Sequence, residues 1–164
     1  MGCSFTKNTD PLESSGPLHF DNDLVMLGPE APFLDKLAYT AKAYVVSVYD
    51  GDTFTVAMRA HGPANNSIVR VKCRLQGIDT PEMRPPKDQE NRDEEIAKAK
   101  AAKKFVQANI LNKHLQLNVA GQDKYGRLLV SVACPDTGLD LTTLLIGQGH
   151  GYKYDGGTKH VFEG

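Results

Sequence analysis

The strongest limit on the fold comes from a series of short β-branched and aromatic runs that begins near Ala43. Such runs, separated by turn-forming residues, predict β-strands. The first three predict a three-stranded meander: AYVVSVY (43–49), TFTVAMR (53–59) and SIVRVKCRLQGI (67–78). The last two predict a closing pair: HLQLNVA (114–120) and RLLVSVAC (127–134).

A single long helix is predicted between these two groups of strands. Residues 89–112 consist of good helix formers, with acids first and lysines later, and Ile96, Ala99, Lys103, Val106 and Ile110 recur near helical spacing. A short helical stretch follows near 139–147. We therefore predict an α+β, mostly β fold: a five-stranded OB-fold Greek-key barrel with one main helix and a short C-terminal helix.

The first forty residues differ in composition from the rest. They mix Pro, Gly, Ser and short apolar patches without a lasting period, and hold two lysines and six acidic residues. Residues 41–164 hold seventeen basic and fourteen acidic residues, so the net charge of −1 conceals a mildly basic folded part. We expect a flexible tail over 1–40 and one monomeric domain over 41–164.

The three cysteines point to a reducing environment. Cys3, Cys73 and Cys134 are odd in number, far apart and without zinc-like spacing, so we expect free thiols. The first residues lack the pattern of a secretory signal, and no apolar run approaches the roughly 20 residues that span a bilayer. These features favour a cytoplasmic location.

The first segment that could carry chemistry is Asp50-Gly51-Asp52-Thr53. Asp-Gly between two alternating runs is typical of a tight hairpin turn, which is a purely structural interpretation. The functional interpretation is that Asp52 supplies a hard oxygen ligand of the kind that Ca²⁺ prefers.

The second segment runs from Arg74 to Glu82, where a strand ends and a proline-fixed turn begins. Arg74 lies on one strand face with Gln76, pointing along the barrel towards the loop that carries Asp79 and Glu82. A strand cap with surface ion pairs is the structural alternative.

The third segment is the turn Asp123-Lys124-Tyr125-Gly126-Arg127, which could also be an ordinary charged hairpin. Together the three segments supply carboxylates for a metal and a proton acceptor, and guanidinium groups for a phosphate. This inventory suits metal-assisted hydrolysis of a phosphodiester.

The ordered motifs YDGDT, RLQGIDTPE and DKYGR, with a helix between the second and the third, resemble the staphylococcal-nuclease-like (thermonuclease) family over about residues 43–155. The resemblance implies a Ca²⁺ cofactor and a nuclease that cuts DNA or RNA by water attack and leaves 3′-phosphate ends. It further implies site residues in three groups: metal ligands Asp52, Asp79 and Thr80 (through its carbonyl); catalytic residues Arg74, Glu82 and Arg127; substrate-binding residues Lys124, Tyr125 and Tyr152.

Two alternatives to the nuclease stay open: a non-catalytic OB-fold binding module, and a membrane-tethered interaction protein, which rests only on the N-terminal tail. Some related domains have lost their carboxylates and only bind nucleic acid or protein, but Asp52, Asp79 and Glu82 are all present here. Tyr154 fits a packing residue better than a ligand contact, because it lies in a Tyr-x-Tyr stretch.

The start of the chain fits a pattern for lipidation. Met1-Gly2-Cys3-Ser4-Phe5-Thr6 matches the N-myristoylation pattern at Gly2, with Cys3 placed for palmitoylation, although a chance match is the alternative. Two acyl groups would anchor the protein stably to the cytosolic face of a membrane, because a single myristoyl chain binds only marginally.

Overall fold

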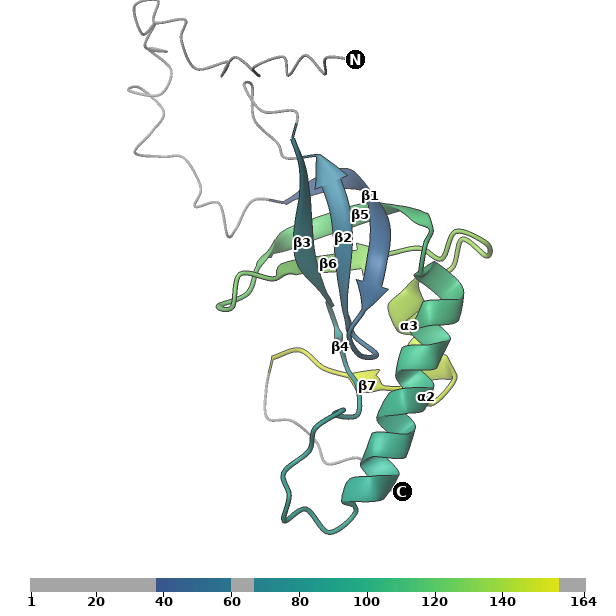
Figure 1. The fold of residues 1–164 in the computed structure, drawn as a ribbon. Helices are drawn as coiled ribbons and strands as arrows, with labels where there is room; N and C mark the ends of the chain where they lie inside the picture. The colour runs from purple at the N-terminus through teal and green to yellow at the C-terminus, as the bar shows by residue number, and fades with distance from the viewer. Residues whose placement is uncertain (1–37, 60–66, 157–164) are drawn as a thin grey trace, which may run out of the picture. The chain divides into compact units, whose positions relative to one another are not determined.

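The computed structural model describes residues 38–59 and 67–156, and their main feature is a closed five-stranded barrel (Figure 1). The order around the barrel is β1-β2-β3-β6-β5, antiparallel except for the parallel pair β3–β6. This confirms the predicted OB-type α+β fold. The strands are β1 (Tyr39–Val48), β2 (Thr53–Arg59), β3 (Ile68–Leu75), β5 (His114–Gln122) and β6 (Leu128–Val132).

A second, two-stranded sheet lies at one end of the barrel and was not predicted. The run 67–78 is not one strand, because a turn at Gln76-Gly77 separates β3 from β4 (Ile78–Asp79). Gly77 has a φ of 77°, a value that favours glycine. β4 pairs with β7 (Tyr152–Lys153), and two residues are too few to leave a strand pattern in the sequence.

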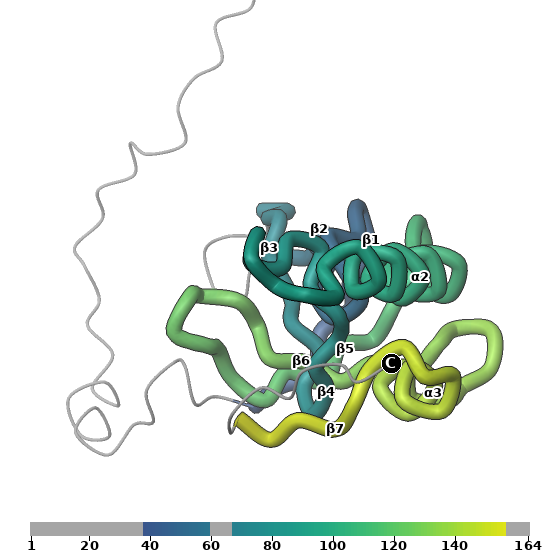
Figure 2. Tube along the Cα trace, turned by 90° about the horizontal axis from the view of Figure 1, so that it is seen from below, coloured from purple at the N-terminus to yellow at the C-terminus, as the bar shows by residue number. Residues whose placement is uncertain are grey.

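Two helices pack against the barrel. The long helix α2 (Arg92–Ile110) contacts β1, α3 (Leu141–Gly147) contacts β6, and the two helices contact each other, as the view from below shows (Figure 2). The buried positions of α2 are Ala99, Ala102, Val106 and Ile110. Lys103, which lay on the predicted apolar spacing, is only half-buried, one position away from the face that Ala102 occupies.

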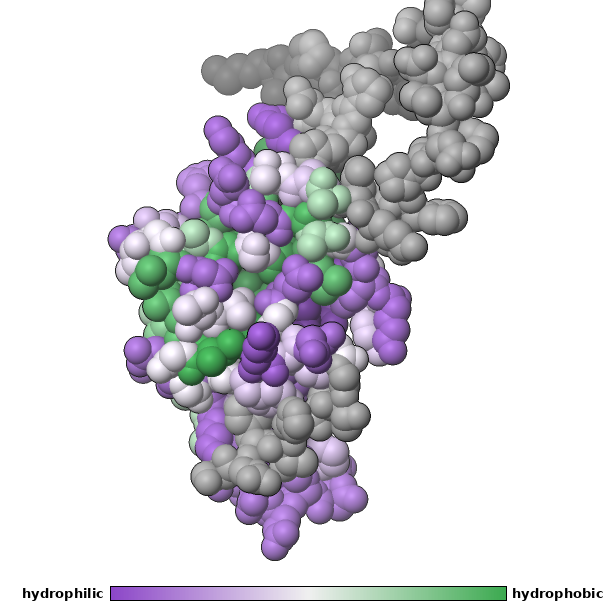
Figure 3. Space-filling model, turned by 180° about the vertical axis from the view of Figure 1, so that it is seen from behind, coloured by the Kyte–Doolittle hydropathy of each residue, from purple (hydrophilic) through white to green (hydrophobic). Residues whose placement is uncertain are grey.

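The core fills the barrel and the space under the helices. Its largest fully buried side chains include Phe54, Leu75, Ile78 and Leu117. Cys73 and Cys134 are buried free thiols. On the face shown in Figure 3, hydrophobic areas are interspersed with hydrophilic ones. No helix among the described residues is long and apolar enough to span a membrane.

Several predictions concern residues outside the described ranges. They include residues 1–37 of the predicted tail, with Gly2 and Cys3, and the turn residues 62–66 between β2 and β3. β1 begins at Tyr39, two residues before the predicted start of the domain.

Candidate active site

The turn between β1 and β2 presents two aspartates in different roles. Asp50 Oδ1 accepts hydrogen bonds from the backbone N–H of Thr53 (2.9 Å) and of Asp52 (3.4 Å), so this carboxylate closes the turn. Asp52 is 6% exposed and its Oδ1 accepts from the Thr53 hydroxyl at 2.8 Å. The structural interpretation of this segment, a tight hairpin turn, therefore rests on Asp50.

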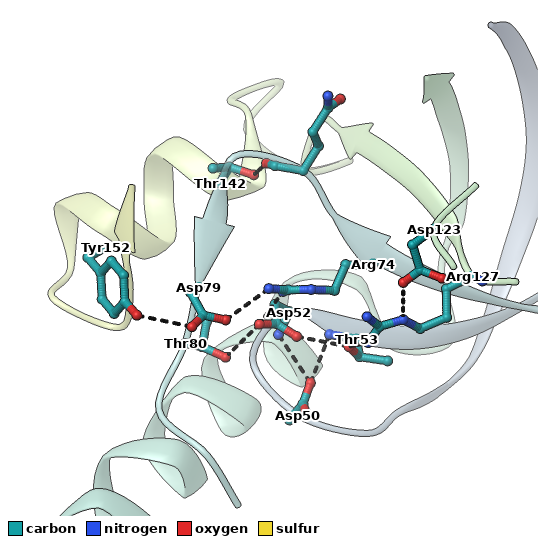
Figure 4. A network of polar contacts seen from close by, with 11 residues as sticks. Asp50, Asp52, Thr53, Arg74, Asp79, Thr80, Asp123, Arg127, Thr142 and Tyr152 are labelled. Atoms are coloured by element: carbon teal, nitrogen blue, oxygen red, sulfur yellow. Dashed lines mark hydrogen bonds and ion pairs between the residues drawn. The ribbon is translucent and has the colours of Figure 1, made fainter. Parts of the chain in front are cut away.

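Arg74 links two carboxylates from different parts of the chain. Its Nη1 forms an ion pair with Asp52 Oδ2, and its Nη2 lies 2.9 Å from Asp79 Oδ1 (Figure 4). The side chain of Arg74 is 12% exposed and that of Asp79 is 4% exposed, so little water reaches these contacts. Charges so poorly hydrated need partners, which the guanidinium supplies to both carboxylates at once.

Tyr152 holds the other oxygen of Asp79. The Tyr152 hydroxyl donates to Asp79 Oδ2 at 3.0 Å, and the two residues are paired in the β4–β7 sheet. The preceding residue, Gly151, allows this approach, because a Cβ there would lie 2.7 Å from Ile78 Cδ1 and 2.8 Å from the Asp79 carbonyl oxygen. A larger residue at this position would push β7 away from β4.

Thr80 and Gly51 bring the β1–β2 turn against the start of the loop after β4. Thr80 is 4% exposed, and its hydroxyl donates to Asp52 Oδ2 at 3.2 Å. A Cβ on Gly51 would come within 2.9 Å of the Thr80 side chain and of Ala102 Cβ on α2. Helix α2 therefore positions Asp52 by direct packing against its turn.

Arg127 reaches the same region from the turn before β6. Its Nε donates to Asp123 Oδ2 at 2.6 Å, and its Nη1 donates to the Thr53 hydroxyl at 3.4 Å. Burial raises the pKa of Asp123, but hydrogen bonds from Arg127 and from the Tyr125 backbone outweigh it and hold this pKa below 3.8. Asp123 is therefore an anchor that orients the Arg127 guanidinium.

The electrostatics of the β1–β2 turn are unusual at Asp50. Burial first, and then the charge and hydrogen bond of the neighbouring Asp52, raise the pKa of its carboxyl to about 7, against the lowering effect of the backbone hydrogen bonds. The negative charge of Asp52 so close by disfavours the charged form of Asp50. The turn therefore favours a cation near Asp50 and Asp52.

Glu82 lies just beyond this cluster, on the exposed loop that leads to α2. Its backbone N–H donates to Glu95 Oε1 at 3.0 Å, and Glu95 Oε2 also accepts from the Gln89 side chain. Glu95 thus ties both ends of this loop to the first turn of α2. The loop carries Glu82 at the surface, next in sequence to the buried residues 78–81.

Lys124 and Tyr125 occupy the exposed tip of the β5–β6 turn. Tyr125 is 73% exposed, and the Lys124 Nζ and Arg127 Cζ atoms lie 5.1 Å and 5.6 Å from its ring centroid. Gly126, with a φ of 77°, turns the chain sharply so that Arg127 points back to the barrel. The Lys124 ammonium, the Arg127 guanidinium and the Tyr125 ring therefore form one polar surface.

A pocket of about 410 Å³ adjoins Arg74 on the side of β4 and β7. Tyr154, half-buried and predicted to be a packing residue, lines this pocket, whereas Tyr152 points to Asp79 instead. We call it the Tyr154 pocket; its lining includes Arg74, Gly77, Leu129, Lys153, Tyr154 and Asp155.

Most of the residues predicted for the site gather at one end of the barrel. Direct contacts join Asp52, Arg74, Asp79, Thr80 and Tyr152, and Thr53 links Asp52 to Arg127. Sequence reasoning missed the supporting residues Asp50, Thr53, Asp123, Glu95, Gly51 and Gly151. Asp50 and Asp123 stood in the quoted motifs, but their turn chemistry hid their positioning roles.

Within the described ranges, no group of three or more His, Cys, Asp or Glu side chains is arranged to hold a metal ion. A cation at this end of the barrel would therefore depend on two carboxylates together with neutral oxygen atoms. Asp52, Asp79 and Thr80 offer such a set.

Comparison with known proteins identifies the family of this chain through one family model. No curated protein matches the chain. The family model described as staphylococcal nuclease homologue matches residues 72–160, more than half of the chain. The matched range includes Arg74, Asp79, Glu82 and Arg127, whereas Asp52 precedes it. The chain belongs to the staphylococcal nuclease homologue family.

Proposed function

We propose that this protein is a Ca²⁺-dependent nuclease that hydrolyses phosphodiester bonds of DNA, RNA or both and leaves 3′-phosphate ends. One observation carries the proposal: the buried carboxylates of Asp52 and Asp79 flank the Arg74 guanidinium, at the barrel end that Arg127 also reaches. Two carboxylates able to bind a metal beside two guanidinium groups are an arrangement that suits phosphodiester hydrolysis.

The donor atoms present fit Ca²⁺. Asp52, Asp79 and the carbonyl of Thr80 are hard oxygen donors, and all three residues are less than 10% exposed. Calcium takes 6–8 oxygen ligands, so water and substrate oxygens would complete the set. When bound, the ion would polarise a phosphoryl oxygen and offset its negative charge.

The two arginines would bind the scissile phosphate. Arg74 uses two of its five N–H groups on the carboxylates, which leaves donors for a phosphate oxygen. Arg127 is oriented by Asp123 and keeps one terminal nitrogen 3.4 Å from the Thr53 hydroxyl. Guanidinium groups fixed in this way stabilise the charge that develops on phosphate oxygens without reorganising during the reaction.

Glu82 would take the proton from the attacking water. Its place on an exposed loop beside the buried cluster allows solvent water to reach the carboxylate. The water oxygen forms a bond to phosphorus as the bond to the 5′-oxygen breaks, and the leaving oxygen takes up a proton. General-base catalysis of this kind contributes about 10²–10⁴-fold to the rate.

The test is digestion of end-labelled single-stranded DNA and RNA by the full chain, with CaCl₂ or with EGTA. Glu82→Gln and Arg127→Ala are expected to lower the rate by at least about a hundredfold. Glu90→Gln and Arg59→Ala are matched controls, because Glu90 is an exposed carboxylate of the same loop and Arg59 is an exposed arginine at the opposite end of β2.

The product ends give a second readout. Products with 3′-phosphates accept 3′-end labelling only after phosphatase treatment. Oligonucleotide binding without cleavage, with and without Ca²⁺, would contradict the proposal and favour a non-catalytic OB-fold binding module.

A further inference from the structure

A second groove adjoins the site and shares no lining residue with the Tyr154 pocket. It has a volume of about 430 Å³ and opens on the surface of β1 and β2, next to Arg127. We call it the outer groove; its lining is Ser47, Val48, Tyr49, Asp50, Thr53, Thr55, Lys72, Lys103 and Arg127.

The strand register makes the outer groove continuous with the site. Thr53 of β2 is paired with Arg74 of β3, and the next residues on the same faces, Thr55 and Lys72, are paired with each other. Ser47 of β1 continues this row beside Thr55. Two residues along a strand advance about 6.6 Å, which is close to the spacing of successive phosphates in an extended single strand.

The outer groove carries an excess of positive charge. Lys72, Lys103 and Arg127 line it, against the single carboxylate of Asp50, one oxygen of which is engaged by the backbone of its own turn. The lysines come from β3 and α2, so they approach the groove from two different elements. Cations on both sides of a groove are suited to following a phosphate backbone.

The aromatic side chain at the mouth of the outer groove adds a base-binding element. Tyr49 lines the groove and is 57% exposed, although a tyrosine ring gains stability from burial. An exposed ring beside cationic side chains is the combination with which proteins bind single-stranded nucleic acid, because every base has a face that can stack on it.

We propose that the outer groove is a second nucleotide subsite for a single-stranded polynucleotide. Lys72 and Lys103 bind the phosphate next to the scissile one, and Tyr49 stacks on the adjoining base. The inference rests on the proposed nuclease function and deepens it. Because the Tyr154 pocket is lined by other residues, one strand that occupies both hollows is held at two separate places, which favours cuts within a strand over removal of terminal nucleotides.

Binding measured in EGTA tests the outer groove apart from catalysis. The probes are a fluorescein-labelled oligothymidylate of eight nucleotides, long enough to occupy both the outer groove and the Tyr154 pocket, and a thymidine dinucleotide as a competitor. We expect Lys72→Gln/Lys103→Gln and Tyr49→Ala each to weaken binding of the eight-residue strand by about tenfold and to leave the dinucleotide within twofold. The double variant should also lower the slope of log K against log[salt] by about 0.7, the value for the loss of one phosphate contact on a single strand.

Lys42→Gln/Lys104→Gln is the matched control, because both lysines are exposed and neither lines the outer groove. It removes the same charge and should leave the affinity within twofold of wild type. Equal losses in the two double variants, or wild-type affinity in Lys72→Gln/Lys103→Gln, would overturn the proposal.

Kinetics separate this inference from the proposed function. Cleavage by the wild type that collapses in Glu82→Gln, with unchanged affinity and KM in the groove variants, would refute the subsite and keep the nuclease. Loss of binding in the groove variants of a protein that does not cleave would keep the subsite and refute the nuclease. If both hold, the groove variants raise KM for the eight-residue strand and keep kcat within twofold.

Discussion

Replacing Gly151 by Ala tests whether the close approach of β7 to β4 holds the site together. The new Cβ would lie 2.7 Å from Ile78 Cδ1, 2.8 Å from the Asp79 carbonyl oxygen and 2.9 Å from Ile78 Cγ1. Ile78 is 1% exposed and the carbonyl belongs to the backbone, so neither can move aside freely. The clash is relieved only if β7 shifts away.

The expected cost has two overlapping parts. Overpacking a buried contact costs about 1–3 kcal/mol, and losing a hydrogen bond to a charged group costs about 1.5–3 kcal/mol. A shift of β7 that relieves the clash also stretches the 3.0 Å hydrogen bond from Tyr152 to Asp79. We therefore expect the free energy of unfolding to fall by about 2–4 kcal/mol.

Urea unfolding followed by circular dichroism measures this change, since the chain contains no tryptophan for fluorescence. With an m-value of about 2 kcal/mol per molar, the midpoint should fall by about 1–2 M. Gly147→Ala is the matched control, because it makes the same chemical change at the exposed end of α3, where the added Cβ would point into open space. It should change stability by less than about 1 kcal/mol. Tyr152→Phe removes only the hydroxyl and so measures its contribution to the free energy of unfolding. A wild-type midpoint in Gly151→Ala would refute the reasoning.

Three further predictions concern other parts of the fold. Asp140 caps α3 by accepting from the Thr143 N–H at 2.8 Å, so Asp140→Ala should lower stability by about 1 kcal/mol in thermal unfolding and Asp140→Asn should restore most of it. Burial raises the pKa of the Cys73 thiol to about 12 and also raises that of Cys134, so at pH 8 hardly any reactive thiolate forms. In a Cys3→Ser variant, a thiol-reactive dye should label native protein slowly and urea-unfolded protein at once; fast native labelling would contradict this. The pKa of Asp123 is lower in the folded state than its ordinary 3.8, so its charge stabilises the fold above that pH, and the benefit disappears as the pH falls through the lowered pKa. Asp123→Asn should therefore be less stable than wild type by about 1 kcal/mol at pH 7, and urea midpoints measured at successively lower pH should show this difference shrinking.

Local pattern was enough to predict the barrel strands and the helices. Alternating β-branched runs and a long stretch of helix formers are properties of neighbouring residues, and they led to the five barrel strands, α2 and α3 with boundary errors of a few residues. The ends of elements were predicted less well, as at Gln76-Gly77, because a turn depends on backbone angles that composition only weakly favours.

The candidate site residues were predicted mainly because three motifs resemble those of the staphylococcal-nuclease-like family. How these residues are arranged relative to one another could not be predicted from the sequence. Asp52 and Thr80 are 28 positions apart and Asp79 and Tyr152 are 73 apart, yet each pair shares a hydrogen bond. The interpretation of Tyr154 shows the same limit, because whether its ring packs or lines a pocket depends on how β7 meets β4.

The sequence by itself determined which residue types are available and where strands and helices form, since backbone propensity and hydrophobic period act over a few neighbouring residues. Only the tertiary structure decided that Thr53, Arg74 and Arg127 meet, because β2 pairs with β3 and β3 runs parallel to β6 in one particular register. The outer groove likewise forms only in the tertiary structure, since its two lysines come from β3 and α2. Closing a barrel brings distant residues together through long-range hydrogen bonds and packing, and these contacts have no local signal in the sequence.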